Sequence, residues 1–416
     1  MIQTTRLSNG MTLLVERMPG VRSAAGSWLV PAGTGEEPSD RLGLGAMWSE
    51  LLMRGAGALG SRAHADACDR AGLTRGVETG PRFVRVGFSL VGSRFADAFG
   101  LIAGMVTDPR MDAASIEPAR ELALSAIDAL RDDPQERAML AARARHFPAP
   151  LDRSSLGTRA GLEAITRKDL VAGWASRARP GRSILGVAGD VDPGEVAAVV
   201  ERATRGWSGT CVPAPIAGVP ARGYSHEEDP SNQVQVVVMQ DAPLAHHPDA
   251  VLERVVASVL SGGMSGRLFT EVRERRGLCY SVSASYSPGR ETGVLVSYVG
   301  TTPERAQESL DVLWAELGRL SSPEGRISDE ELGRALVGLR SRVVFSGEST
   351  GARASGIASD QNALGRARTL DDIMAELEGV TLDRVNEYLA RRATGRATIQ
   401  TLGPGALTPP AEVGGR

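Results

Sequence analysis

The sequence has few of the residues that mark disulfide-rich, membrane-spanning or nucleic-acid-binding proteins. Its 3 cysteines are odd in number and far apart, so they predict neither a disulfide framework nor a paired-cysteine metal site. No uninterrupted apolar run reaches the ~18 residues that suggest a transmembrane helix. A reducing compartment fits this cysteine usage best, and we expect a cytoplasmic protein that does not contact a membrane.

Positive charge is also limited. Lys168 is the only lysine, and 47 basic against 50 acidic residues give a net charge of −3. The densest basic run, Arg273 to Arg276, is interrupted by Glu274. Because nucleic-acid binding needs a continuous positive surface, the sequence predicts no nucleic-acid partner.

What the sequence does contain is typical of a large globular protein. Of its 416 residues, 42% are hydrophobic and 23% are charged, which allows a sizeable core and argues against disorder. The 49 glycines follow no regular period, so a collagen-like chain is excluded. The length predicts more than one domain.

An internal repeat indicates how these domains are built. Residues 86–92 (VGFSLVG) and 294–300 (VLVSYVG) each form a strand pattern followed by a helical pattern, and Gly92 and Gly300 are 300 − 92 = 208 positions apart. Thr166 and Thr381 each precede a helical segment as an N-cap. The sequence therefore predicts an α+β fold made of two homologous copies, each a mixed or antiparallel sheet covered by helices.

The composition also predicts the domain boundaries. Residues 208–223, rich in Pro, Gly and Ala, are typical of a linker. This separates an N-terminal domain, residues 1–207, from a C-terminal domain, residues 224–403. Residues 404–416 are expected to form a flexible tail.

Two motif regions and the opening hairpin identify a family. Residues 43–55 (GLGAMWSELLMRG), residues 262–281 (GGMSGRLFTEVRERRGLCYS) and the Asn9-Gly10 turn resemble the pitrilysin/insulinase family of zinc metallopeptidases. The similarity is to its short two-domain subunits, such as mitochondrial processing peptidase and its bacterial relatives. It implies a clamshell-like arrangement of the two copies.

The resemblance also shows what this chain has lost. Active members carry an H-x-x-E-H motif whose histidines bind zinc and whose glutamate polarises the attacking water. Aligning the flanking residues places Ala46 and Glu50 at the two histidines, Ser49 at the catalytic glutamate, and Ala126 at the third ligand. We therefore expect no metal or other cofactor in this chain, and zinc only in a partner subunit.

One other residue pair has a spacing that suits a metal site. His64 and Cys68 are four residues apart on a predicted helix, a spacing that allows two ligands on one face. The favoured interpretation is a surface histidine and a small buried cysteine.

The second motif keeps residues that matter in active relatives. Arg273 and Tyr280 match an Arg/Tyr pair that, in the family, projects across the cleft toward the scissile peptide. A guanidinium and a phenol can hold a carbonyl and stabilise charge on a tetrahedral intermediate. The alternative is a half-buried strand tyrosine and an arginine paired with Glu271 or Glu274. Gly262 and Gly263 are weaker candidates for peptide contact, because they equally suit a turn.

The leading hypothesis is a non-catalytic, substrate-binding subunit of a heterodimeric zinc peptidase. Its partner would be a same-fold subunit with an intact H-x-x-E-H motif, and its substrate a peptide or unfolded protein. The main alternative is a structural or assembly subunit without peptide chemistry. An autonomous peptidase with a rearranged site, and a peptide binder acting alone or as a homodimer, also remain open.

Overall fold

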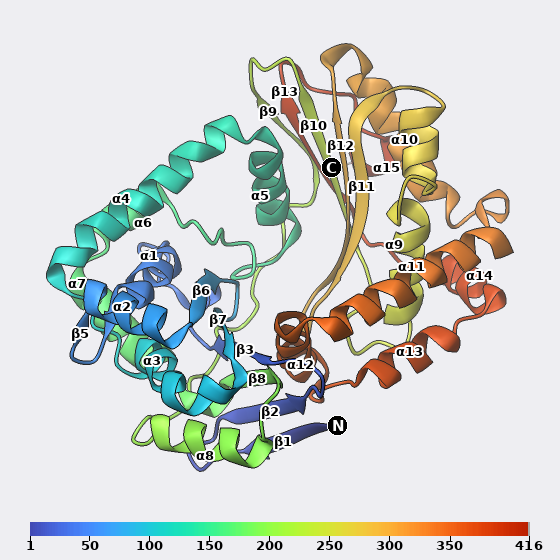
Figure 1. The fold of residues 1–416 in the computed structure, drawn as a ribbon. Helices are drawn as coiled ribbons and strands as arrows, with labels where there is room; N and C mark the ends of the chain where they lie inside the picture. The colour runs from blue at the N-terminus through green and yellow to red at the C-terminus, as the bar shows by residue number, and fades with distance from the viewer. Residues whose placement is uncertain (415–416) are drawn as a thin grey trace. The chain divides into compact units, whose positions relative to one another are not determined.

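The computed structural model describes residues 1–414 and groups the chain into two compact units. Unit 1 contains residues 1–129, 149–218 and 346–369, and unit 2 contains residues 130–148, 219–345 and those from 370 onward. Both units combine a mixed sheet with helices (Figure 1), so the predicted α+β class is confirmed.

Unit 1 is built on a six-stranded sheet with the order β1-β2-β8-β3-β7-β6. Its strands are β1 (Ile2–Arg6), β2 (Thr12–Arg17), β3 (Ser23–Val30), β6 (Thr74–Thr79), β7 (Val84–Val91) and β8 (Ile184–Gly189). Only β2 and β8 run parallel. A separate two-stranded ribbon joins β4 (Gly55–Ala56) to β5 (Leu59–Gly60).

One face of this sheet forms the main core of unit 1. Val86 and Trp28 face each other across β7 and β3, and both are fully buried. The helices of the unit are α1 (Leu44–Leu51), α2 (Ser61–Ala71), α3 (Phe95–Thr107), α4 (Ala113–Ala129), α6 (Arg159–Ala164), α7 (Arg167–Arg177), α8 (Pro193–Ala203) and α12 (Thr350–Leu364). The alternation of buried and open positions along β7 is the period of a strand with one core face.

Unit 2 is built on a five-stranded sheet with the order β11-β12-β10-β13-β9. Its strands are β9 (Gly223–Glu228), β10 (Val234–Asp241), β11 (Cys279–Pro288), β12 (Gly293–Thr301) and β13 (Thr398–Gly403). Its helices are α5 (Pro134–His146), α9 (Ala250–Ser261), α10 (Ala306–Arg319), most of α11 (Asp329–Glu348), α13 (Leu370–Glu378), α14 (Leu382–Arg391) and α15 (Ala411–Gly414). The one parallel pair, β9 with β13, again joins an opening strand to a closing strand.

Each unit includes a helix from the other half of the chain. Helix α5, from the first half, packs on β10 and β13 of unit 2, and helix α12, from the second half, packs on β3 and β8 of unit 1. Gly186 permits the second contact, because a Cβ there would lie 2.4 Å from the Ala354 carbonyl oxygen. The compact units therefore differ from the continuous halves that the repeat predicts.

The ends of the two halves follow their sequence signals. Thr166 and Thr381 both cap helices, their side chains accepting the backbone N–H of Asp169 and Arg384. Beyond β13, the described part of the tail packs on unit 2. There the backbone N–H of Leu407 donates to the Tyr224 hydroxyl, and Val413 is buried.

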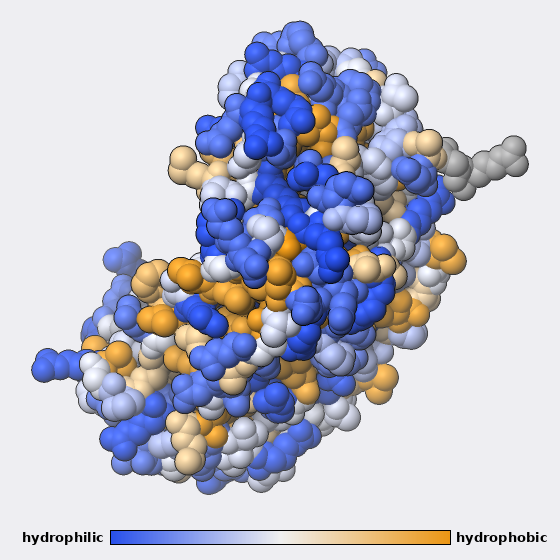
Figure 2. All heavy atoms as spheres, turned by 90° about the vertical axis from the view of Figure 1, so that its right-hand side faces the viewer, coloured by the Kyte–Doolittle hydropathy of each residue, from blue (hydrophilic) through white to orange (hydrophobic). Residues whose placement is uncertain are grey.

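No helix in residues 1–414 is long and apolar enough to cross a lipid bilayer. The helices at the right of Figure 1 turn their outer faces to the viewer in Figure 2, where hydrophilic side chains predominate and hydrophobic ones lie in groups between them. This is the pattern of amphipathic helices that bury one stripe and leave the rest in water.

Candidate functional site

Helix α1 carries three of the four residues that the sequence resemblance aligns with the family's zinc ligands and catalytic glutamate. It begins after Gly43, whose φ of +123° lies outside the range that side chains readily adopt. The buried Glu37 carboxylate accepts the N–H groups of Gly43 and Gly45, each at 2.7 Å. Burial raises the pKa of Glu37, and these two hydrogen bonds oppose that rise. Glu37 therefore fixes the start of α1 as a side-chain cap.

A hydroxyl network surrounds Ser49, the residue that the sequence resemblance aligns with the catalytic glutamate. The Ser49 hydroxyl lies 2.9 Å from the Thr79 hydroxyl, and the two lie 3.0 Å and 2.8 Å from the Gly45 carbonyl oxygen. Hydroxyls bound in this way have neither the charge nor the basicity to activate water near neutral pH. Ser49 therefore links α1 to strand β6.

The remaining ligand positions also do not fit zinc. Ala46 is partly buried in the core, and Ala126 is exposed on α4, which packs against α1. Glu50 is a competent oxygen ligand, but its carboxylate lies 3.8 Å from the Arg54 guanidinium. Within residues 1–414, no group of three or more His, Cys, Asp or Glu side chains is placed to hold a metal. One carboxylate with two methyl groups does not make a zinc site.

The prediction that His64 lies on the surface is wrong, whereas Cys68 is buried as expected. His64 is 1% exposed, and its Nε2 lies 3.2 Å from the Leu101 carbonyl oxygen. The Cys68 sulfur lies 3.9 Å from the other ring nitrogen. Burial lowers the pKa of His64 and raises that of Cys68, so this pair is a satisfied part of the core of unit 1.

Arg273 lies in an irregular turn of unit 2. It belongs to η6 (Phe269–Glu274), a π-helical turn that packs against β11. Its guanidinium stacks over the Phe269 ring at 5.0 Å from the centroid. The alternative interpretation, an ion pair of Arg273 with Glu271 or Glu274, is wrong. Glu271 binds Arg275 and Arg276 instead. In residues 1–414, Arg273 makes no ion pair within 4.0 Å, and it is exposed.

Tyr280 also sits at an irregularity, at the start of the edge strand β11. The pairing of β11 with β12 shifts between Cys279 and Ser281, so Tyr280 is the extra residue of a β-bulge. Its side chain is 68% exposed, which excludes the half-buried strand residue of the alternative interpretation. Burial raises the pKa of the neighbouring Cys279 thiol, and the positive charge of Arg273 opposes that rise.

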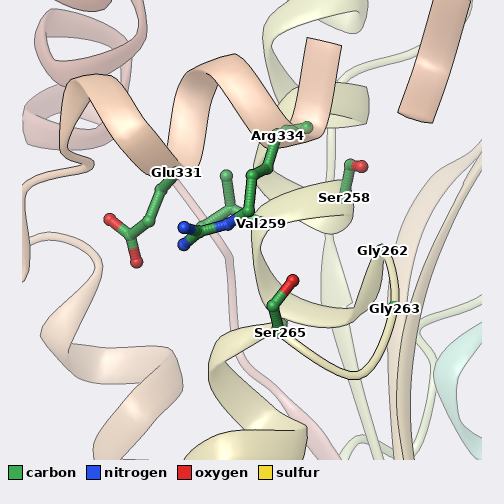
Figure 3. A pocket seen from close by; sticks show the side chains of 9 residues that line it. Ser258, Val259, Gly262, Gly263, Ser265, Glu331 and Arg334 are labelled. Atoms are coloured by element: carbon green, nitrogen blue, oxygen red, sulfur yellow. The ribbon is translucent and has the colours of Figure 1, made fainter. Parts of the chain in front are cut away.

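Gly262 and Gly263 lie just beyond the C-terminal end of α9. They line a small cavity of about 50 Å³ together with Ser258, Ser265 and residues of α11 (Figure 3). A Cβ at Gly262 would lie 2.4 Å from the Ser258 carbonyl oxygen, whereas one at Gly263 would meet nothing within 4 Å. Gly262 is thus required by the turn itself, and a role in peptide contact remains a prediction for both glycines.

This turn is held by an ion pair that the sequence did not predict. Arg267 is 8% exposed and binds both oxygens of Glu331, at 2.6 and 2.8 Å, as well as the carbonyl oxygens of Gly325 and Arg326. Burial alone would raise the pKa of Glu331, but the Arg267 and Ser328 hydrogen bonds outweigh it and lower the pKa from 4.5 to about 2. The partners are 64 positions apart in the sequence, which explains why no local pattern revealed the pair.

The comparisons with known proteins confirm the predicted resemblance. Residues 164–339 match the family model described as the peptidase M16 inactive domain; the pitrilysin/insulinase peptidases form family M16. An uncharacterized zinc protease of Mycobacterium tuberculosis is 27% identical over 410 residues, which is 96% of this chain and 92% of that protein. One from Bacillus subtilis is 24% identical and covers 98% of this chain and 100% of its own length.

Solved structures show the same fold. A peptidase M16 inactive domain from Pseudomonas fluorescens has a TM-score of 0.85 at 20% identity and covers 99% of both chains. A chain of complex III2 from Candida albicans has a TM-score of 0.82 at 17% identity, with 97% of this chain and 96% of that chain covered. The chain thus has an M16-type peptidase fold, with the zinc motif replaced.

Proposed function

We propose that this chain is the non-catalytic, substrate-binding subunit of a heterodimeric zinc peptidase. The observation that carries the proposal is that the zinc-binding side chains are lost whereas the Arg/Tyr pair is retained. The zinc positions of unit 1 hold Ala46, Ser49, Glu50 and Ala126, while Arg273 and Tyr280 of unit 2 are both exposed. M16-fold proteins often work as pairs of homologous subunits, and this chain has the pattern of the partner that lacks metal.

The local geometry supports a role for the Arg/Tyr pair. Arg273 lies in a π-helical turn and Tyr280 in a β-bulge, two irregularities that are over-represented at functional sites because they redirect a side chain. A subunit with a purely structural role needs neither the π-helical turn nor the β-bulge to form its sheet. In the proposed assembly, the guanidinium and the phenol donate to the carbonyl oxygen of the bound peptide and stabilise the negative charge that develops on it. The zinc is held by the partner alone.

Cellular location is part of the same proposal. The three cysteines, at 68, 211 and 279, are unpaired, which suits a reducing compartment. We place the complex in the cytoplasm, where it would act on peptides or unfolded chains.

Affinity purification of the tagged chain from its own organism tests the proposal. We expect one co-purifying protein in equal amount, of the same fold and with an intact H-x-x-E-H motif. Recovery of the chain alone, or only with unrelated components, contradicts the heterodimer.

A second candidate function is a structural or assembly subunit without peptide chemistry. The similarity to a chain of complex III2 favours it, since that fold occurs there within a large assembly. The two candidates differ at one point: replacing Arg273 and Tyr280 removes activity from the complex only under the first.

A further inference from the structure

Unit 1 contains a groove that the Arg/Tyr pair does not explain. It lies on the face of the sheet opposite the main core and is lined by residues of β6, β7, β3 and helix α12. Its volume is about 390 Å³, toward the low end of the ~300–1,000 Å³ of small-ligand sites. This is enough for one large side chain with its flanking backbone.

The floor of the groove is formed by two glycines that neither packing nor backbone conformation requires. Gly76 on β6 lies directly opposite Gly87 on β7, and Gly87 lies opposite Ser27 on β3. A Cβ at Gly76 or Gly87 would meet nothing within 4 Å, and neither residue has a positive φ. Glycine within a strand costs stability relative to alanine. Neither packing nor backbone conformation accounts for that cost here.

Other glycines of the same sheet differ in this respect. A Cβ at Gly26 would lie 2.1 Å from the Phe88 ring, and one at Gly186 would collide with α12. Those two glycines are required by packing inside the protein. Gly76 and Gly87 instead leave open space above the strands, as expected where a ligand approaches the backbone closely.

A buried hydroxyl provides the second, independent observation. Ser27 lines the groove and is 4% exposed, yet its Oγ has no hydrogen-bond partner in residues 1–414. An unpaired buried polar group costs stability, because it gives up its hydrogen bonds to water. The unpaired Ser27 hydroxyl thus lowers the stability of the free protein, and a ligand group that bonded to it from the groove would explain why it is there.

The walls of the groove are polar and held in place. Arg85 forms an ion pair with Glu78 and donates to the Ser355 hydroxyl of α12 at 3.2 Å. Thr74 and Ser89 add two further hydroxyl groups. A ligand on the floor would therefore have a guanidinium and hydroxyl groups beside it, all of which can form hydrogen bonds.

We propose that this groove binds an aromatic side chain of the substrate peptide, with tyrosine preferred. The inference rests on the proposed peptide-binding function. A planar ring covers the two exposed glycine backbones over its whole face, as cross-strand aromatic residues cover glycines within sheets. A phenol hydroxyl at the far end of the ring supplies the missing partner of Ser27 Oγ, which a phenylalanine or leucine side chain cannot do.

The test uses the full-length chain and fluorescein-labelled dodecapeptides that differ only in a central Tyr, Phe, Leu or Ser. Fluorescence polarisation is expected to rank binding as Tyr, then Phe, then Leu and Ser. Ser27→Ala is expected to remove the about 3- to 10-fold preference for Tyr over Phe that one hydrogen bond provides. Binding of the Phe peptide should stay within about twofold.

The glycine floor is tested with Gly76→Val and Gly87→Val, and with the smaller Gly76→Ala and Gly87→Ala. The valine variants should lose the Tyr and Phe preference while their melting temperature stays level or rises, because valine favours a strand. Gly100→Ala is the matched control at an open glycine of α3 and should leave peptide ranking unchanged.

The outcomes separate the two proposals. Equal binding of all four peptides, or an aromatic preference that survives the valine variants, overturns the groove while leaving peptide binding intact. Absence of binding of every peptide, to the wild-type chain and to its purified complex, overturns the proposed peptide-binding function and the groove with it.

Discussion

At the scale of single residues, the ion pair between Arg267 and Glu331 makes the clearest prediction. Glu331→Gln should lower the free energy of unfolding at pH 7 by about 2–4 kcal/mol, because it leaves a buried guanidinium without its charged partner. Glu330→Gln is the matched control on the same helix; its side chain is 82% exposed, and a surface pair contributes about 0–1 kcal/mol. Chemical denaturation measures both variants.

The same residue predicts a dependence on pH. Its pKa is lower in the folded chain, about 2, than the ordinary value of 4.5. Its contribution is therefore complete above about pH 5 and is lost as pH falls through about 2. Denaturation between pH 6 and 2 should show the difference between wild type and Glu331→Gln shrinking toward the acidic end. A difference that stays constant over this range contradicts the assignment.

At the scale of structural elements, the exchanged helix α5 is the feature to test. His146 at its end is 1% exposed, with Nδ1 3.1 Å from the Thr398 hydroxyl and Nε2 3.5 Å from Asp241. Burial alone would raise the pKa of Asp241, but hydrogen bonds from His146 and Arg222 lower it to about 2. This network attaches α5 to strands β10 and β13.

His146→Ala should therefore destabilise unit 2 by about 2–4 kcal/mol, since it removes a buried ring and its hydrogen bonds. Hydrogen exchange should increase in α5 and in the adjoining strands β10 and β13. Gln135→Ala, at an exposed position of the same helix, is the control and should change neither quantity. Unchanged protection of α5 in His146→Ala would show that other contacts hold the helix.

The elements also show how far the sequence could predict the structure. The fold class followed from strand and helix periods, and the lost zinc positions followed from the resemblance to a family whose motif has a fixed spacing. Both are local signals. The sequence repeat aligns Val86 with Val294, but these two residues lie on opposite faces of their respective sheets. Val86 faces the core of unit 1, whereas in unit 2 it is the next residue, Leu295, that belongs to the core cluster. A shift of one residue reverses every side chain of a strand.

Other features depend on contacts between distant residues. The exchange of α5 and α12 leaves no local signal, because each helix has apolar and polar residues whichever sheet it covers. The burial of His64 depends on the Leu101 carbonyl, 37 residues away. The groove was missed for the same reason, since Gly76, Gly87 and Ser27 become neighbours only through strand register.

At the scale of the whole molecule, the account predicts independence from metal. The purified chain should contain less than about 0.1 zinc per chain by elemental analysis, because a site with one carboxylate and no imidazole binds zinc poorly. Treatment with 1,10-phenanthroline should leave its melting temperature unchanged, whereas the complex with its partner should lose peptidase activity. Stoichiometric zinc together with peptide cleavage by the isolated chain contradicts the account.

The measurement that tests the central claim most directly is the peptidase activity of the complex purified on this chain. We compare wild type with Arg273→Ala/Tyr280→Phe and with the control Arg275→Ala/Ser283→Ala, whose positions lie directly after the same turn and in the same strand. The first variant should keep its partner in equal amount but lose about 10²–10³-fold in kcat/KM, the effect of removing donors to a developing oxyanion, while the control stays near wild type. Full activity in Arg273→Ala/Tyr280→Phe would contradict the proposal that this chain contributes to the partner's active site.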